Sequence, residues 1–186
     1  MHDALGLIQK LAGHETLSGP EAELVMAGLL AGALETPDIV LLLRALNERP
    51  VTPAELSGFA RIMRAHAARV FPPGEVPPAK LVDTCGTGGD GTGTFNISTA
   101  AAFVAAAAGV PVAKHGNRSV SSRCGSADVL EALGVRLDLP IEQAGRAIRE
   151  IGIGFLFAPA AHAALRSLRE LPTRGKGLLQ CSKGFR

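Results

Sequence analysis

Apolar residues recur every three or four positions along the first third of the chain, which is the period of a helix that buries one face. Three helix-start signals divide this region, each a Ser or Thr followed closely by proline: Ser18–Pro20, Thr36–Pro37 and Thr52–Pro53. The connections between the three predicted helices are short, which favours a compact arrangement. The pattern therefore predicts a helical subdomain over residues 1–70.

Proline dominates the next segment. The residues from Phe71 to Pro78 include four prolines, and proline is excluded from the interior of a helix because it lacks the backbone N–H group. Such a segment is stiff and extended. We therefore expect a connector over residues 71–80, with a domain boundary within it.

Beyond the connector, short apolar runs of strand length alternate with longer stretches of helical period. This alternation predicts an α/β fold over residues 81–165, with a mostly parallel sheet that is flanked by helices. Ligands bind such sheets at the carboxyl ends of the strands, which places the chemistry after Asp83 and after Ala113. The predicted strands are 81–83, 110–113, 135–137 and 153–157, and the predicted helices are 96–108, 126–133, 140–151 and 159–168.

Composition narrows the class of protein further. Hydrophobic residues make up 47% of the 186 residues, which excludes a disordered chain, and no apolar run is long enough to cross a membrane. The beginning of the chain lacks the apolar core of a signal peptide, so the expected location is the cytoplasm. Three cysteines without C-x-x-C spacing predict free thiols rather than disulfides or a zinc site, with Cys85 as a small packing residue.

The net charge of +2 is unevenly distributed along the chain. Residues 166–186 contain six Lys and Arg residues and a single Glu, so the rest of the chain is acidic on balance. A basic tail is typical of nucleic-acid contact, and also of a terminal segment that is simply solvated. We expect the solvated segment and no nucleic-acid partner, while nucleic-acid binding stays open as an alternative.

The loop after Asp83 is rich in glycine: five of the eight residues from Gly86 to Gly93 are Gly. Glycine lets backbone N–H groups approach an anion closely, and a helix that begins near Asn96 would present its free amides to the same anion. The glycine spacing matches neither a P-loop nor a dinucleotide-binding motif. The loop therefore predicts a phosphate-binding site, with a flexible turn and ordinary capping by Asn96 or Ser98 as the alternative.

The loop after Ala113 is rich in cationic and hydroxyl side chains. Residues 114–126 include one Lys, two Arg, one His, one Asn and four Ser, which is a dense set of donors for an anion. His115 fits either a general base or a neutral donor, and Asp128 and Glu131 are interpreted as acidic residues at a helix N-terminus. Two anion-binding loops suit a phosphorylated sugar that carries a pyrophosphate, with displacement at a sugar carbon assisted by a divalent metal.

Several motifs in and around these loops follow one another in a fixed order: GTGGD at 86–90, TFNIST at 94–99, KHGNR at 114–118, GSADVLE at 125–131 and GIGFLFAP at 152–159, followed by His162. Together they resemble the anthranilate phosphoribosyltransferase family. The resemblance implies a helical subdomain joined to an α/β domain of the class II nucleoside phosphorylase type. It also implies transfer of the phosphoribosyl group of phosphoribosyl pyrophosphate to the amine of anthranilate, with release of pyrophosphate, in tryptophan biosynthesis.

The resemblance further implies which residues touch the substrates and the metal. Mg²⁺ is the expected cofactor, with Ser98 as its contact, and Gly86 and Asn117 would face anthranilate. No catalytic side chain is assigned, because the amine would attack the ribose carbon without a covalent enzyme intermediate. The residues expected around phosphoribosyl pyrophosphate are Gly86, Gly89, Asp90, Thr94, Asn96, Ile97, Ser98, Thr99, Lys114, His115, Gly116, Asn117, Arg118, Ser119, Val120, Ser121, Ser122 and Ser126.

Two parts of the family pattern have no counterpart in this chain: an anthranilate-contacting Arg beyond His162, and an Asp–Glu pair that binds Mg²⁺ further along. We therefore expect a C-terminally truncated member with an incomplete sheet, in which residues 166–186 form an atypical basic tail. The resemblance implies a homodimer whose subunit contact is formed by residues 1–70. The alternative to an enzyme is a truncated, inactive relative that binds a phosphosugar or a nucleic acid.

Overall fold

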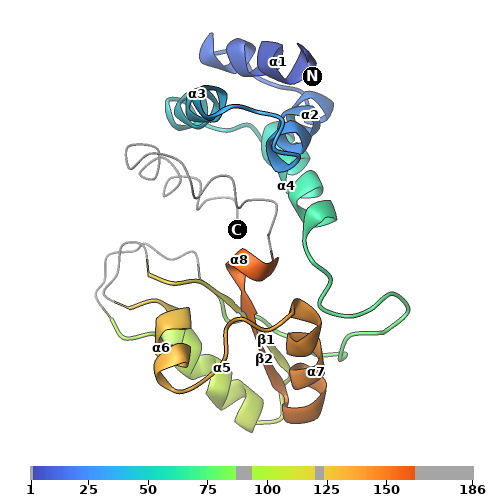
Figure 1. Cartoon of the computed structure of the whole chain (residues 1–186), viewed down its shortest axis with the longest axis vertical. Coiled ribbons are helices and arrows are strands. Elements are labelled where there is room, and N and C mark those ends of the chain that lie inside the picture. The colour runs from blue at the N-terminus through green and yellow to red at the C-terminus, as the bar shows by residue number, and fades with distance from the viewer. Residues whose placement is uncertain (1, 87–93, 120–123, 162–186) are drawn as a thin grey trace. The chain divides into compact units, whose positions relative to one another are not determined.

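The computed structural model describes residues 2–86, 94–119 and 124–161, which divide into two compact units (Figure 1). One unit contains the chain as far as Ala67, and the other begins at Ala68. Across the described ranges, we find no helix that combines the length and the apolar character needed to span a membrane.

Within the described residues, the first unit consists of four helices: α1 (His2–Ala12), α2 (Gly19–Leu30), α3 (Thr36–Asn47) and α4 (Pro53–His66). The last three are the helices predicted from the proline-containing start signals. The first, α1, is not among the predicted helices, because no capping residue precedes it to mark its start.

A single apolar core holds the helical unit together, and all four helices contribute to it. The side chains that face it are large and aliphatic or aromatic, and burying such a side chain stabilises a fold by about 1.5–3 kcal/mol. Those buried to 2% exposure or less include Ile8, Leu11, Val25, Leu42 and Phe59.

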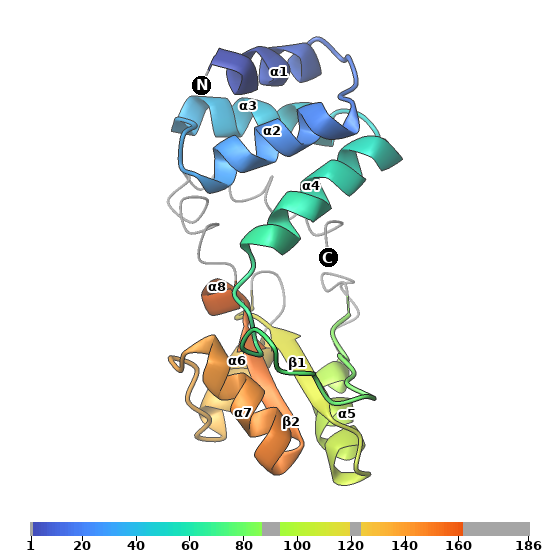
Figure 2. The same ribbon diagram turned by 90° about the vertical axis from the view of Figure 1, so that its right-hand side faces the viewer.

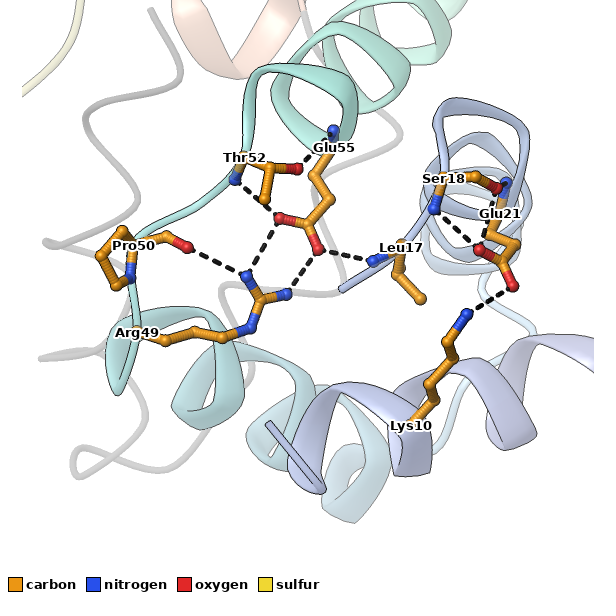
Figure 3. Close-up of polar contacts among 8 residues, drawn as sticks. All are labelled: Lys10, Leu17, Ser18, Glu21, Arg49, Pro50, Thr52 and Glu55. Atoms are coloured by element: carbon orange, nitrogen blue, oxygen red, sulfur yellow. Dashed lines mark hydrogen bonds and ion pairs between the residues drawn. The ribbon is translucent and has the colours of Figure 1, made fainter. Parts of the chain in front are cut away.

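Glu21 ties the start of α2 to α1 (Figure 3). Its carboxylate accepts a hydrogen bond of 2.7 Å from the backbone N–H of Ser18, the N-cap of α2, and pairs with the Lys10 ammonium at 2.9 Å. The hydrogen bond from Lys10, followed by those from Ser18, lowers the pKa of Glu21 to about 2. The capping interaction at α2 is therefore also a contact between two helices.

Glu55 plays a corresponding part at the start of α4, but its side chain is completely buried (Figure 3). The carboxylate accepts hydrogen bonds from both Nη atoms of Arg49, at 3.1 and 2.5 Å. It also accepts one from the backbone N–H of Thr52 and one from the backbone N–H of Leu17, each at 2.8 Å. One buried carboxylate thus joins the α1–α2 connection, the α3–α4 connection and the first turn of α4.

The second unit contains a small parallel sheet with helices on its two faces. The strands β1 (Val112–Gly116) and β2 (Ile153–Phe157) pair in register from Val112↔Ile153 to Gly116↔Phe157, and an isolated parallel bridge joins Val82 to Val112. Figures 1 and 2 show α5 (Ile97–Ala107) and α7 (Ile141–Ile151) on opposite sides of the strands. The remaining described helices are α6 (Ser126–Ala132) and α8 (Ala158–Ala161). The predicted class, a helical subdomain followed by an α/β unit with a parallel sheet, is therefore confirmed.

Two predicted strands are wrong or displaced, for one physical reason. The run 110–113 was predicted as a strand, but β1 begins two residues later, because the N–H of Val110 bonds back to the carbonyl of Ala105 at 3.0 Å. The run 135–137 is not a strand, because the N–H of Val135 bonds back to Leu130 at 2.9 Å. Each valine follows a glycine with φ near +83° and closes the preceding helix, so an apolar residue after a C-terminal glycine resembles the start of a strand.

The other predicted elements differ less from the observed ones. The predicted strand 81–83 is reduced to the single bridge at Val82. The strand 153–157 and the helices at 96–108, 126–133 and 140–151 are confirmed to within a residue at most boundaries. The predicted helix 159–168 is observed as α8 up to Ala161, and the rest of it lies outside the described residues.

Candidate functional site

The chain segment that enters the first glycine loop is fixed at the carboxyl end of the Val82 bridge. The hydroxyl of Thr84 donates to the backbone carbonyl of Ser98 at 2.7 Å, which ties this segment to the first turn of α5. The Oδ1 atom of Asp83 accepts hydrogen bonds from the backbone N–H of Cys85 at 2.9 Å and of His115 at 3.2 Å. The segment is therefore held to both α5 and β1 before the loop begins at Gly86.

The first turn of α5 offers polar groups toward this loop. Asn96 is the N-cap residue but makes no side-chain capping bond; its amide donates instead to the carbonyl of Cys124 at 3.2 Å. Thr99 is only 3% exposed, and its hydroxyl has no hydrogen-bond partner among the described residues. Ordinary capping by Asn96, the alternative given above, is therefore not observed. A buried hydroxyl without a partner is costly, which makes this turn suited to a polar ligand.

Lys114 lies within β1, not in a loop after the strand as predicted. Its side chain is 2% exposed, and its ammonium donates to the backbone carbonyl of His115 at 2.7 Å. No carboxylate pairs with it in the described parts of the chain. Burying an ammonium without a counter-ion costs several kcal/mol, so this position favours an anion nearby.

Gly116 and Gly125 allow the second loop to pack directly against the sheet. A Cβ atom at Gly116 would overlap Oγ of Ser126 and lie 2.8 Å from Cε2 of Phe155. At Gly125 a Cβ would lie 2.7 Å from the carbonyl oxygen of Asn117. Real Cβ atoms do not approach other atoms this closely, so both positions require glycine.

Asp128 closes the base of the second loop. Its Oδ2 accepts hydrogen bonds from the backbone N–H of Ser119 at 2.9 Å and of Gly125 at 2.7 Å, which lie on either side of residues 120–124. These two bonds are the main cause of a lowered pKa for Asp128. The N-terminal position predicted for Asp128 in α6 is confirmed, and the same carboxylate also holds the loop.

Glu131 and Arg118 form a second link between the loop and α6. The guanidinium of Arg118 bonds to both carboxylate oxygens of Glu131, at 2.6 and 2.7 Å, and more weakly to Asp128 at 3.3 Å. This contact raises the pKa of Arg118 and lowers that of Glu131. Glu131 lies one residue before the C-terminal end of α6, so its predicted place at the helix N-terminus is wrong; it holds Arg118 instead.

The structure brings the described ends of the two loops together. Asn96 contacts the backbone of the second loop, and the backbone of His115 contacts Asp83 at the start of the first. Thr94 and Ile97 are exposed beside them. The bond from Thr84 to α5 and the hold of Asp128 on the second loop were not predicted, because both depend on contacts between residues that are apart in the sequence. The residues of the candidate site that lie outside the described parts are Gly89, Asp90, Val120, Ser121 and Ser122.

The hydrogen bonds of Asp128 lead to a prediction about stability. Replacing Asp128 by Ala should destabilise the second unit by about 1.5–3 kcal/mol, because two backbone N–H groups lose a charged acceptor. The matched control is Asp138→Ala, since Asp138 pairs with Arg136 at 3.0 Å on the surface and such pairs contribute at most about 1 kcal/mol. Urea unfolding of both variants measures the difference, and equal losses would contradict the role assigned to Asp128.

Comparison with known proteins places the chain in one family. Residues 5–67 match the helical bundle domain of a glycosyl transferase family, and residues 78–174 match its a/b domain. The chain therefore belongs to this glycosyl transferase family.

Within that family the chain resembles one kind of enzyme. It is 55% identical over 159 residues to the anthranilate phosphoribosyltransferase of Solibacter usitatus, and 56% identical over 159 residues to that of Desulforudis audaxviator. Each alignment covers 86% of this chain but only 46% and 45% of the relative, so the chain spans about half the length of the curated relatives it matches. The resemblance stated from the motifs is confirmed.

Solved structures agree with the sequence comparison. The anthranilate phosphoribosyltransferase of Thermus thermophilus superimposes with a TM-score of 0.82 at 43% identity, over 96% of this chain and 54% of that one. The Saccharomyces cerevisiae enzyme, in complex with phosphoribosyl pyrophosphate and Mg, gives a TM-score of 0.76 at 25% identity, over 95% of this chain and 51% of that one.

Proposed function

We propose that this chain carries the phosphoribosyl pyrophosphate-binding loops of an anthranilate phosphoribosyltransferase and transfers the phosphoribosyl group to the amine of anthranilate. The observation that carries the proposal is the buried ammonium of Lys114, which lies in β1 beside the segment that enters the glycine loop. The relatives that are 55% and 56% identical to this chain over 159 aligned residues have that activity by name.

The electrostatics of Lys114 favour a phosphate ligand over a neutral one. Its only hydrogen bond within the described residues goes to a main-chain carbonyl, which carries a dipole but no full charge. In a site shielded from water, a phosphate oxygen compensates the ammonium far better than a carbonyl does, because charge-assisted hydrogen bonds are about twice as strong as neutral ones. The charge of the Lys114 ammonium is thus compensated less well without a ligand than with a bound phosphate.

The first turn of α5 provides a second group of donors that favours a phosphate ligand. Helix N-termini attract phosphate through their free N–H groups and the positive end of the helix dipole. The side chain of the N-cap residue Asn96 makes no capping bond to α5, and the buried hydroxyl of Thr99 has no partner among the described residues. We assign this turn, from Asn96 to Thr99, to the pyrophosphate.

The proposed reaction is a displacement at the anomeric carbon of the ribose. The amine nitrogen of anthranilate forms the new C–N bond, the C–O bond to pyrophosphate breaks, and the amine loses one proton. Positive charge develops on the sugar and negative charge on the leaving group. The protein therefore accelerates the reaction by positioning the two substrates and by stabilising these charges. Lys114 and the α5 turn act on the leaving group. Gly86 and Asn117 are proposed to face anthranilate.

Mg²⁺ is the proposed cofactor, and Ser98 is the residue proposed to contact it. The half-buried Ser98 offers a hydroxyl oxygen beside the turn assigned to the pyrophosphate, and Mg²⁺ prefers oxygen ligands and commonly takes substrate phosphates and water as most of them. The donor set therefore fits an ion that arrives with its substrate. When bound, the ion would neutralise charge on the departing pyrophosphate.

Calorimetry with phosphoribosyl pyrophosphate and Mg²⁺ tests the binding half of the proposal on the full chain. Binding heat followed by anthranilate turnover, measured as loss of anthranilate fluorescence together with pyrophosphate release, is the expected result. Binding heat without turnover would identify the inactive phosphosugar-binding relative. Absence of heat, together with salt-sensitive binding to DNA, would overturn both phosphosugar hypotheses.

We also propose that the protein works as a cytoplasmic homodimer with its subunit contact on residues 1–70. The family resemblance suggests this arrangement, and the helical unit exposes apolar side chains that suit a subunit contact: Leu5 at 39%, Leu24 at 51% and Leu56 at 41%. We retain residues 71–80 as the proposed connector and 81–165 as the proposed binding domain. Sedimentation equilibrium measures the mass in solution, and a monomer at all concentrations would contradict the dimer.

A further inference from the structure

Three side chains of metal-binding type meet at the entry to the first glycine loop. A carboxylate oxygen of Asp83, the sulfur of Cys85 and a ring nitrogen of His115 all lie within 4.8 Å of one another. Asp83 and Cys85 are next-but-one neighbours, whereas His115 comes from β1, so the fold creates this cluster and the sequence spacing does not reveal it. No role in the proposed phosphoribosyl transfer requires a thiol here.

One distance in the cluster is close to that between two ligands of a bound ion. The sulfur of Cys85 and Nδ1 of His115 are 3.8 Å apart. Tetrahedral zinc with Zn–S of about 2.3 Å and Zn–N of about 2.0–2.1 Å places its sulfur and nitrogen ligands about 3.6 Å apart. Cys85 and His115 are therefore within a small movement of the spacing that an ion requires, and the Asp83 carboxylate lies within 4.8 Å of both.

The backbone orders the three ligands before any ion is bound. Oδ1 of Asp83 accepts the backbone N–H groups of both Cys85 and His115, at 2.9 and 3.2 Å. Hydrogen bonds that fix ligating residues in this way increase the affinity of metal sites. Cys85 and His115 are half-buried and Asp83 is exposed, so an ion can reach the cluster from solvent.

We propose that Asp83, Cys85 and His115 form a binding site for a thiophilic divalent cation, of which Zn²⁺ is the representative. Thiolate and imidazole select zinc-like ions over Mg²⁺, which prefers oxygen, so this site is chemically distinct from the proposed Mg²⁺ contact at Ser98. Three protein ligands leave a fourth position for water or for an oxygen of a bound ligand. The ion would displace the thiol proton of Cys85.

Titration of the full chain with Co²⁺ tests the proposal directly. Co²⁺ bound to a thiolate gives a sulfur-to-metal charge-transfer band in the near ultraviolet, and Zn²⁺ should remove the band by displacing the cobalt. We expect one equivalent of Co²⁺ to produce the band in a non-chelating reductant, and millimolar Mg²⁺ to leave it unchanged. Absence of the band would overturn the site.

Cysteine variants locate the ion. The double variant Cys124→Ser with Cys181→Ser leaves Cys85 as the sole thiol of the chain and should retain the band. Cys85→Ser should lose the band and lower Zn²⁺ affinity by more than about 100-fold, since loss of even an outer-shell partner costs 10–100-fold. His115→Gln should lower the affinity in the same direction, with far-ultraviolet circular dichroism confirming that each variant is folded. A band that survives in Cys85→Ser, or disappears in the double variant, would place the ion elsewhere and refute the proposal.

Discussion

Replacing Lys114 by Met should weaken binding of phosphoribosyl pyrophosphate about 10- to 150-fold while leaving the protein as stable as before, or more so. The affinity falls because one charge-assisted hydrogen bond of about 1.5–3 kcal/mol is lost. The stability does not fall, because Met fills a similar volume and removes a buried ammonium that has no counter-ion in the described residues. A residue that lowers the stability of the fold while it increases the affinity for a ligand is typical of a binding site.

Calorimetry in Mg²⁺ buffer measures the affinity, and urea unfolding measures the stability of the same preparation. Lys80→Met is the matched control, because Lys80 is exposed and its loss changes the net charge by the same amount. The control should change the affinity less than about threefold, since exposed charges act weakly through screened solvent. Equal affinity for the two variants would show that Lys114 does not touch the ligand. A large loss of stability in Lys114→Met would show that the ammonium is structural.

Replacing Glu55 by Gln should destabilise the helical unit by about 3–5 kcal/mol, because it leaves the nearly buried guanidinium of Arg49 without its counter-ion. The side chain of Arg49 is 10% exposed, and within the described residues its Nε atom already lacks a partner. The double variant Arg49→Met with Glu55→Gln should recover part of the loss, since it removes the orphaned charge.

Urea unfolding followed by far-ultraviolet circular dichroism measures these effects. Glu48→Gln serves as the control: Glu48 pairs with Arg44 at 3.7 Å, both side chains are about half exposed, and such pairs contribute no more than about 0.5 kcal/mol. If Glu55→Gln were as mild as Glu48→Gln, the buried pair would not hold the unit together.

The same carboxylate predicts how stability depends on pH. Burial raises the pKa of Glu55, but the hydrogen bonds from Arg49, Leu17 and Thr52 outweigh this effect and lower the pKa from 4.5 to about 2. The folded-state pKa lies below that of the unfolded chain, so the stabilisation is fully present above about pH 4.5 and is lost as the pH falls toward 2. Glu55→Gln should make this acid transition shallower, and the part that remains includes Glu21, whose pKa is lowered to the same range.

The sequence predicted much of the fold where a local signal marks each element. Proline in the first turn identified α2, α3 and α4, although Thr36 is the first residue of α3 and Glu35 is its N-cap. A run of continuous apolar residues identified β2. The errors at Val110 and Val135 have the opposite origin: the backbone N–H of each valine closes the end of a helix, and a pattern of apolar residues cannot distinguish such a position from the start of a strand.

The candidate site was predicted less completely, because parts of it depend on contacts between distant residues. The glycine loop and the Lys114 motif are contiguous in sequence, so their residue types already indicated an anion. The burial of Lys114 depends on the helices around β1, and the meeting of Cys85 with His115 depends on the pairing of the Val82 segment with β1. Neither the burial of Lys114 nor the contact between Cys85 and His115 can be predicted from a short stretch of the sequence.

The register of the parallel sheet has a consequence for how the chain folds. β1 and β2 pair Val112 with Ile153, and α6 and α7 lie between them, so this pairing requires a long loop to close before it gains any hydrogen bond. In the helical unit, by contrast, each helix can form from neighbours in sequence. Folding rates fall as contacting residues become more distant along the chain. The helical unit, which precedes the sheet in the chain, is therefore expected to fold early, and the sheet is expected to set the overall rate.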